Sequence, residues 1–213
     1  MKPKNERSNN PLASFFAILW WEIFTLVKLN FIFLLCSLPL ITIGASWTAL
    51  TACNLALVKG EQVQVGREFL TALKKYGFAG ILLGFIASIT LASGGIALYF
   101  YLLWARANML FYLFFFLTLC IEIFLLVSFV YLYPVLVEEK LTVIASCKKA
   151  ISLAAANFST GIVAVIAVGI LVSVIIYTFS FTVPLLFFLG IAVPNFIFCF
   201  IASRAFPPKS EPQ

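Results

Sequence analysis

The chain has 213 residues, of which 63% are hydrophobic and only 10% are charged, and its formal net charge is +6. Because soluble domains carry about 25% charged residues, this composition predicts an integral membrane protein and excludes a water-soluble one. The chain has no His, and all eight acidic residues are Glu, which excludes Ser-His-Asp triads, His-ligated metal sites and Asp-based magnesium sites.

Uncharged stretches mark the expected membrane spans, because a helix that crosses a bilayer needs about 20 apolar residues. Pro39 divides the 48-residue stretch 11–58, and Pro184 divides the uncharged 54-residue stretch 150–203, since Pro removes a helical hydrogen bond and clashes with the preceding turn. We expect Pro134 to close one helix and Pro194 to kink another. The sequence thus predicts one all-α domain over residues 1–213, a polytopic bundle of about six transmembrane helices at 14–38, 42–58, 77–103, 109–133, 159–181 and 185–204. The first two helices could instead form a re-entrant hairpin, because the second is short.

The basic residues favour one orientation of this bundle. Twelve of the 14 fall before the first helix, in the connections 59–76 and 134–158, or at and after the last residue of the sixth helix. The six-helix arrangement places these four segments on the same side of the membrane, and only Arg106 on the other. By the positive-inside rule, both termini are expected in the cytoplasm. The positive net charge therefore reflects membrane orientation, and we expect no nucleic-acid partner.

Two connections on that side have a helical pattern of their own. Residues 65–76 and 144–154 place apolar side chains on one face and basic side chains on the other. This pattern is typical of amphipathic helices in the membrane interface, so we expect two cytoplasmic amphipathic helices. The alternative is a docking surface for a cytoplasmic partner, whose contact residues would be Phe69, Lys74, Lys75, Lys148 and Lys149.

Small residues recur every four positions in the second and third expected helices. The stripes are Gly44, Thr48, Ala52 and Ala56 in one helix, and Gly80, Gly84, Ser88 and Ala92 in the other. In lipid there is little hydrophobic drive between helices, so close backbone approach stabilises their packing. We expect these stripes to form packing faces inside one bundle, with homodimerisation through Gly80 and Gly84 as the alternative.

Polar residues inside the expected spans are the strongest candidates for function. They are Glu22, Lys28, Asn30, Asn54 and Glu122. A charge at mid-bilayer costs at least about 2.5–3.5 kcal/mol on insertion scales, and Glu122 lies at the middle of its helix. One hypothesis is a structural Glu122–Lys28 pair, or a neutral Glu122 hydrogen-bonded across helices. The other is a pathway for a solute, an ion or protons. A catalytic carboxylate is disfavoured, because no nucleophile or second acid lies at a matched depth.

Several segments resemble a known family. Lys28-Leu29-Asn30, the segment Leu35–Ala45 with its Leu-Pro-x-x-Thr-x-Gly core, and the Tyr133-Pro134 block resemble the YesL family of bacterial multipass membrane proteins, a domain of unknown function. Within these blocks the family-motif residues are Asn30, Pro39, Thr42, Gly44 and Pro134. The resemblance implies the bacterial cell membrane and a role near sugar import, because members often occur beside genes for carbohydrate uptake. It supplies no catalytic residues, and Tyr76 replaces an Asn that is common in the family.

Two functions fit these observations. The first is a non-enzymatic accessory protein that assembles or regulates a sugar ABC transporter, with no cofactor and no metal. The second is a small solute or proton-coupled transporter or channel that uses Glu122, Lys28 and Asn30. A permease subunit is disfavoured, because residues 144–155 lack the Glu-Ala-Ala segment and the following Gly on which the ATPase docks. Expected partners are the lipid bilayer, sugar ABC transporter subunits and, as an alternative, a second copy of the chain.

The predicted topology is testable by cysteine labelling in intact cells. An Asn108→Cys variant should react with a membrane-impermeant thiol reagent from outside, because residue 108 lies between the third and fourth helices. A Gln64→Cys variant should react only after the cells are opened. Labelling of residue 64 in intact cells, or protection of residue 108 from the outside reagent, would show the orientation to be wrong.

Overall fold

The computed structural model describes residues 11–105, 108–177 and 190–206. These residues form α-helices and one short 3₁₀ helix, and no strand occurs among them, which confirms the all-α fold class. The helices are α1 (Pro11–Trp21), α2 (Ile23–Cys36), η1 (Leu40–Thr42), α3 (Ile43–Val58), α4 (Val65–Trp104), α5 (Leu110–Glu139), α6 (Val143–Ala156), α7 (Phe158–Tyr177) and α9 (Ala192–Ala205).

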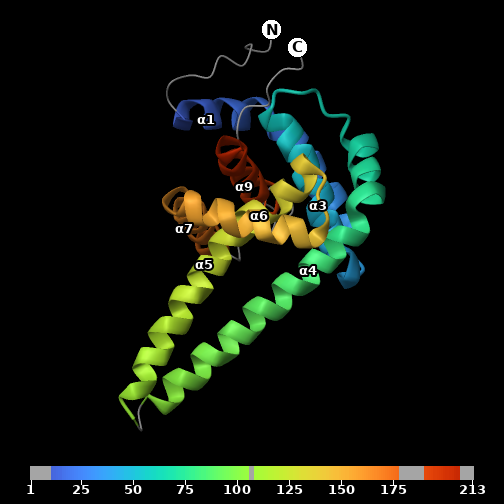
Figure 1. The fold of residues 1–213 in the computed structure, drawn as a ribbon. Coiled ribbons are helices and arrows are strands. Elements are labelled where there is room, and N and C mark those ends of the chain that lie inside the picture. The colour runs from blue at the N-terminus through green and yellow to red at the C-terminus, as the bar shows by residue number, and fades with distance from the viewer. Residues whose placement is uncertain (1–10, 106–107, 178–189, 207–213) are drawn as a thin grey trace, which may run out of the picture.

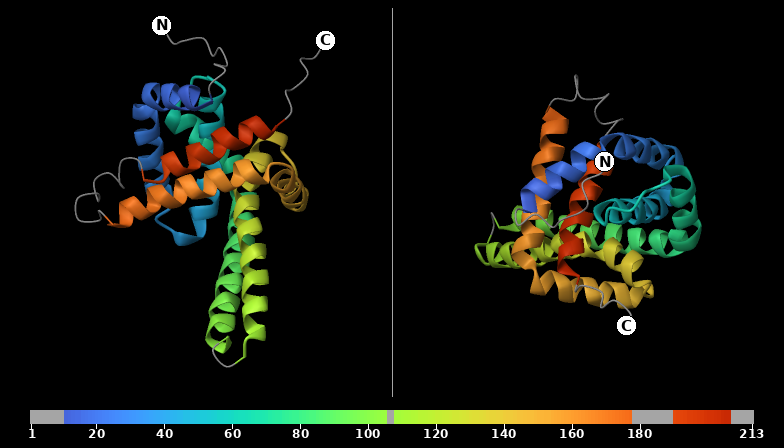
Figure 2. Two further views of the ribbon diagram at one scale, coloured as in Figure 1. Left: turned by 90° about the vertical axis from the view of Figure 1, so that its left-hand side faces the viewer. Right: turned by 90° about the horizontal axis from the view of Figure 1, so that it is seen from above.

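Helices α4 and α5 form a long hairpin that projects from the other helices (Figures 1 and 2). We call the group of α1, α2, α3, α6, α7 and α9, with the adjoining halves of α4 and α5, the head. The projecting part exposes large apolar side chains, among them Ile96, Leu113 and Phe116. In a membrane these side chains contact lipid, because no other part of the described chain covers them.

Among the described residues, fewer helices than the six expected are long enough to cross a bilayer. Only α4 and α5, of 40 and 30 residues, are each long and apolar enough to cross a bilayer. Two bent pairs, α1 with α2 and α6 with α7, could each supply one broken span, giving up to four. Helices α3 and α9 have 16 and 14 residues, short of the roughly 20 that a crossing needs. Residues 178–189, where the fifth expected helix ends and the sixth begins, lie outside the described residues.

The first expected helix, 14–38, is two helices. Helices α1 and α2 meet at Glu22 with a bend of 68°. The bend follows from packing: the Phe15 ring of α1 lies 5.7 Å from that of Phe196 and 5.2 Å from that of Phe200, both on α9. Helix α2 instead turns into the core, where Leu26 is fully buried.

The third expected helix, 77–103, begins earlier than predicted. Residues 65–76 belong to α4, so the first amphipathic segment and the expected span form one continuous helix. Helix α6 is separate, as expected for the second amphipathic segment, and it meets α7 at a bend of 98°. Tyr131 Oη donates a hydrogen bond to the Asn157 carbonyl (3.2 Å) at this bend.

Two prolines lie at other helical positions than predicted. Helix α5 continues past the buried Pro134 to Glu139, rather than ending at residue 133, and Lys140 then adopts a positive φ of 52°. Pro194 lies in the first turn of α9 instead of kinking a helix that starts at 185. In a first turn the missing N–H of Pro has no intrahelical acceptor to lose, so Pro is tolerated there.

Helices α3 and α4 touch backbone to backbone. A Cβ on Gly44 would clash with the Gly80 carbonyl, and a Cβ on Gly80 would lie 2.6 Å from the Gly44 oxygen and closer still to Thr48 Oγ1. A Cβ on Gly84 would lie 3.2 Å from the Gly44 Cα. The predicted packing face is confirmed for these four residues. Because α3 covers Gly80, this position is not free for a second copy of the chain.

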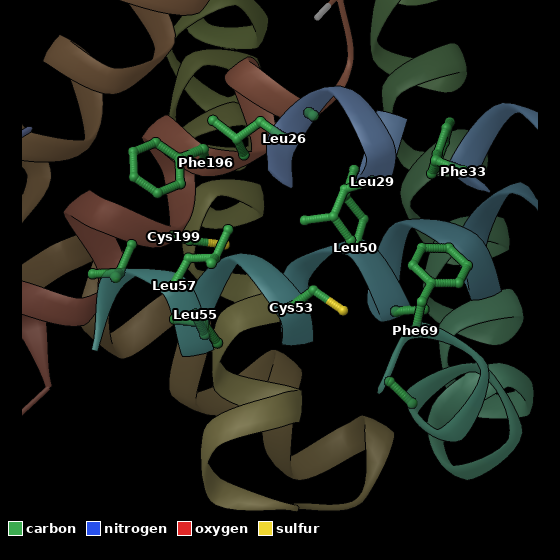
Figure 3. Packing of buried hydrophobic residues seen from close by; sticks show 14 of the residues in the cluster. Leu26, Leu29, Phe33, Leu50, Cys53, Leu55, Leu57, Phe69, Phe196 and Cys199 are labelled. Carbon is green, nitrogen blue, oxygen red and sulfur yellow. The ribbon is translucent and has the colours of Figure 1, made fainter. Parts of the chain in front are cut away.

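Two hydrophobic clusters fill the head. The first joins α2, α3, α9 and the start of α4, and its largest side chains include Leu26, Leu50, Leu57, Phe69 and Phe196 (Figure 3). The second joins α5, α6 and α7, with Leu83 of α4 and with Val127, Tyr131, Ala150 and Ala164. Helix α3 lies between α4 and α9, so it connects the hairpin to the rest of the head.

The glycine contact predicts opposite effects of one substitution at two positions of α4. Gly80→Ala should lower the free energy of unfolding by about 1–3 kcal/mol, because the added methyl group overpacks a backbone contact. Gly95→Ala should raise it by about 0.5–1 kcal/mol, since nothing lies within 4 Å of its Cβ position and Ala favours a helix. The measurement is the thermal midpoint in detergent. Equal midpoints for the two variants would contradict the contact.

Candidate functional site

Three buried asparagines from three helices meet at the start of α9. Asn30 of α2 and Asn54 of α3 are fully buried, and Asn195 of α9 is 1% exposed. Leaving a buried amide without hydrogen bonds costs about 1–3 kcal/mol in proteins. The partners of these side chains therefore determine how the three helices are held together. We call these residues, with Thr51 and Cys199, the asparagine cluster.

Asn30 caps α9 from another helix. Its Oδ1 accepts hydrogen bonds from the backbone N–H groups of Ile191 and Ala192, each at 3.0 Å. The first N–H groups of a helix have no intrahelical acceptor, and in an apolar interior no water replaces it. Asn30 supplies that acceptor, and Pro194 removes a further donor from the same turn.

Asn54 and Asn195 join α3 to α9. Asn54 Nδ2 donates to Asn195 Oδ1 (2.9 Å) and to the Ala192 carbonyl (3.3 Å). Asn195 Nδ2 in turn donates to Thr51 Oγ1 (2.9 Å), and Cys199 Sγ donates to Asn195 Oδ1 (3.4 Å). Asn54 Oδ1 has no hydrogen-bond partner among the described residues.

The chemistry of the cluster is that of neutral donors and acceptors. It contains no carboxylate and no amine, and the same helices contribute Leu26, Leu29, Leu50 and Phe196 to the first hydrophobic cluster (Figure 3). Among the described residues, no group of three or more His, Cys, Asp or Glu is placed to hold a metal ion. The arrangement is suited to fixing the register of α2, α3 and α9, because buried hydrogen bonds of this kind require one particular alignment of their helices.

Glu122 lies away from this cluster. It is half-buried in the α4–α5 hairpin, and its carboxylate packs against Gly94 of α4, where a Cβ would overlap it. Lys28 is exposed on α2, and no Glu122–Lys28 ion pair occurs in the described chain. The expected pair is therefore absent, although Glu122 does face a neighbouring helix. Glu22 accepts a hydrogen bond from Thr25 Oγ1 (2.9 Å) at the α1–α2 bend.

The predicted contact residues divide into exposed and buried ones. Lys74, Lys75 and Lys148 are exposed, with the Lys75 Nζ 5.0 Å from the centre of the Tyr76 ring. Phe69 is fully buried in the first cluster, so its assignment as a contact residue is wrong. Lys149 pairs with Glu139 at the end of α5.

Helix α6 turns small residues inward. Ser146, Ala150 and Ala154 are buried, whereas Ile144 and Ile151 are 72% and 46% exposed. Two ion pairs, Lys59–Glu138 and Lys149–Glu139, tie the end of α5 to α3 and α6. The buried small residues and the Lys149–Glu139 ion pair thus fix α6, and with it the exposed apolar and basic side chains on its outer face.

The family-motif residues serve the fold around this site. Besides the cap made by Asn30, Thr42 Oγ1 donates to the carbonyls of Cys36 (2.6 Å) and Pro39 (2.7 Å), which closes the α2–α3 turn. Gly44 makes the α4 contact, and Pro134 is buried in α5.

Part of the chain matches a known protein family. Residues 26–101 match the family described as "Protein of unknown function, DUF624". This part of the chain is similar to DUF624. The matched range covers most of α2, all of α3 and most of α4, and it includes Asn30 and the glycine contact. No curated protein and no solved structure matches the chain.

Sequence reasoning missed Asn195 and Thr51. Asn195 is an amide in an otherwise apolar run, directly after Pro194 and four residues before Cys199. That combination was a usable signal, because a polar residue beside a helix-starting Pro in a membrane segment needs a partner on another helix. Thr51 had no such signal, since its hydroxyl also bonds the Trp47 carbonyl of its own helix (2.8 Å).

Removal of the Asn30 cap should destabilise the protein. Asn30→Leu leaves the backbone N–H groups of Ile191 and Ala192 without this acceptor at the start of α9, at a cost of about 1–3 kcal/mol for the buried one. Lys28→Leu, two residues away on the exposed face of α2, should change stability by less than about 0.5 kcal/mol. Thermal midpoints in detergent measure both effects. Equal stability of the Asn30→Leu and Lys28→Leu proteins would show that the Asn30 cap does not stabilise the fold.

Proposed function

We propose that this protein is a non-enzymatic membrane protein accessory to carbohydrate uptake, which assembles or regulates a sugar ABC transporter. In this proposal it lies in the bacterial cell membrane with both termini in the cytoplasm, and the YesL-like segments give the link to sugar import. The match of residues 26–101 to a family of unknown function is compatible with this role and does not specify it.

The observation that carries the proposal is the separation of the intramembrane polar groups. A transport pathway needs polar groups that line one route through the bundle. Here Asn30 and Asn54 bond to α9, Glu122 packs on α4, and Lys28 points outward. These contacts favour a role in helix packing over a role in conduction.

A second observation supports docking. On α4, Lys74 and Lys75 are exposed near the exposed apolar Leu70 of the same helix, and on α6 Lys148 is exposed one turn from the exposed apolar Ile144. We call these five residues the basic surface. Their helices are fixed by the glycine contact of α4 and by the ion pairs at the end of α5. A rigid surface that combines apolar and basic side chains suits a partner whose contact surface is apolar and acidic.

The transporter hypothesis keeps one supporting observation. The half-buried carboxylate of Glu122 lies within the projecting hairpin and occupies the space that a side chain at Gly94 would fill. If Glu122 carries protons, Glu122→Gln should abolish transport and leave stability nearly unchanged. This alternative is therefore separable from the accessory role by a transport assay.

Charge reversal on the basic surface tests the accessory role. Affinity purification from native membranes should recover sugar ABC transporter subunits with the unaltered protein. Combined Lys74→Glu, Lys75→Glu and Lys148→Glu should remove them, because an acidic partner surface is then repelled. Lys28→Glu, an exposed charge on α2, is the matched control and should retain them.

Two results would contradict the proposal. One is an unaltered protein that inserts normally and recovers no transporter subunit. The other is full recovery with the triple variant, which would place any docking elsewhere. Membrane insertion of each variant is checked by carbonate extraction, so that loss of the partner is not confused with loss of the protein.

A further inference from the structure

Helix α1 lies across the head and is not collinear with α2, which follows it after a bend of 68°. In two views at right angles it runs across the direction of the α4–α5 hairpin, at the end of the head that is remote from the hairpin tip (Figures 1 and 2). Since the hairpin is long and apolar enough to cross a bilayer, a helix across its direction lies parallel to the membrane plane. That is the placement of an interfacial helix.

The side chains of α1 are apolar on both faces. Phe15 packs on Phe196 and Phe200 of α9, and Ile18 and Leu19 also pack on the first cluster. On the outer face Phe16 is 62% exposed and Trp20 is 77% exposed. Exposed Trp side chains are typical of the headgroup level, where the ring is apolar and the N–H meets polar groups.

The side chain of Arg204 supplies a positive charge near this helix. Arg204, exposed in the last turn of α9, places its guanidinium 4.7 Å from the centre of the Phe200 ring. The Phe200 ring is the one that contacts Phe15 of α1. The guanidinium is therefore one ring away from α1, in a position that a lipid phosphate next to the helix can reach. Arg binds phosphate through paired, charge-assisted hydrogen bonds.

We infer that α1 and Arg204 form a binding surface for anionic phospholipid at one face of the bilayer. The aromatic side chains of α1 enter the layer just below the headgroups, and Arg204 pairs with a headgroup phosphate. The sequence before α1 carries Lys2, Lys4 and Arg7, and basic residues near an anionic surface each add about 1 kcal/mol of attraction. This inference is independent of the accessory role.

Depth-dependent quenching of Trp20 tests the position of α1. A protein that keeps only this indole, with Trp21, Trp47 and Trp104 changed to Phe, is placed in nanodiscs of phosphatidylglycerol and phosphatidylcholine. Lipids brominated near the carbonyl end of the acyl chain should quench Trp20 at least about twofold more than lipids brominated near the chain end, as expected for an interfacial helix. Stronger quenching from the chain end would show that α1 is part of a span. No quenching by either lipid would show that water or a protein covers it.

Arg204 variants test the choice of lipid. Raising the share of phosphatidylglycerol should increase Trp20 quenching in the parent, and Arg204→Gln should remove this increase. Arg204→Lys should retain part of it, because the charge remains and the paired geometry is lost. A protein that keeps only Trp104, at the far end of α4, is the control, and its quenching should not respond to Arg204. An Arg204→Gln protein with an unchanged response to phosphatidylglycerol would overturn the assignment.

Discussion

The close contact between α3 and α4 is the constraint on which the rest of the structure depends. Gly44, Gly80 and Gly84 let two backbones touch, and Thr48 occupies the space beside Gly80. In lipid such contacts replace the hydrophobic drive that holds helices together in water. The contact fixes the first part of α4 to the head, and the rest of this 40-residue helix projects from there. Tyr133 Oη of α5 lies 3.5 Å from the Gly84 Cβ position, so α5 joins at the same place.

The later turns of α3 carry the asparagine cluster. Thr51 and Asn54 hydrogen-bond with Asn195 of α9, whereas Gly44 and Thr48, earlier in the helix, contact α4. Helix α3 is therefore in contact with both the hairpin and α9, and α9 in turn contacts α1 through Phe196 and Phe200. This chain of contacts places the bilayer-crossing hairpin and the interfacial helix at fixed angles to each other. It gives a physical reason why a short helix of 16 residues occupies the centre of the molecule.

The sequence predicted the structure correctly where residues close together in the chain determine it. The stripes of small residues predicted close helix packing, because backbone approach requires Gly at the crossing point, and the structure shows that the two helices carrying the stripes contact each other. The predictions were wrong where the structure depends on packing against distant parts of the chain. Nothing in the sequence near Glu22 breaks a helix, and the bend there comes from the packing of Phe15 on α9. Residues 65–76 resembled a separate helix, yet an amphipathic segment and an apolar span share one helical period and can run on without a break.

The candidate site shows the same division. Asn30 and Asn54 were predicted as important polar residues, but the missing member, Asn195, lies 141 residues from Asn54 along the chain. The Glu122–Lys28 pair was inferred from similar depth in two expected helices, and depth does not specify which face a side chain occupies. Phe69 was assigned to a docking surface because it lies on the apolar face of the amphipathic segment 65–76, whereas the first cluster buries this side chain completely.

Disulfide trapping between α3 and α4 tests the central contact most directly. The Ala45 Cβ lies 3.7 Å from the Cβ position of Gly77, within the range of about 3.5–4.5 Å that a disulfide needs. Ala45→Cys with Gly77→Cys, in a protein whose native cysteines are replaced and whose 59–64 loop carries a protease site, is oxidised in native membranes and then cleaved. The two fragments should stay joined until a reductant is added, while Ala45→Cys with Gly95→Cys should separate at once. Fragments of the first pair that separate without reductant would contradict the contact between α3 and α4.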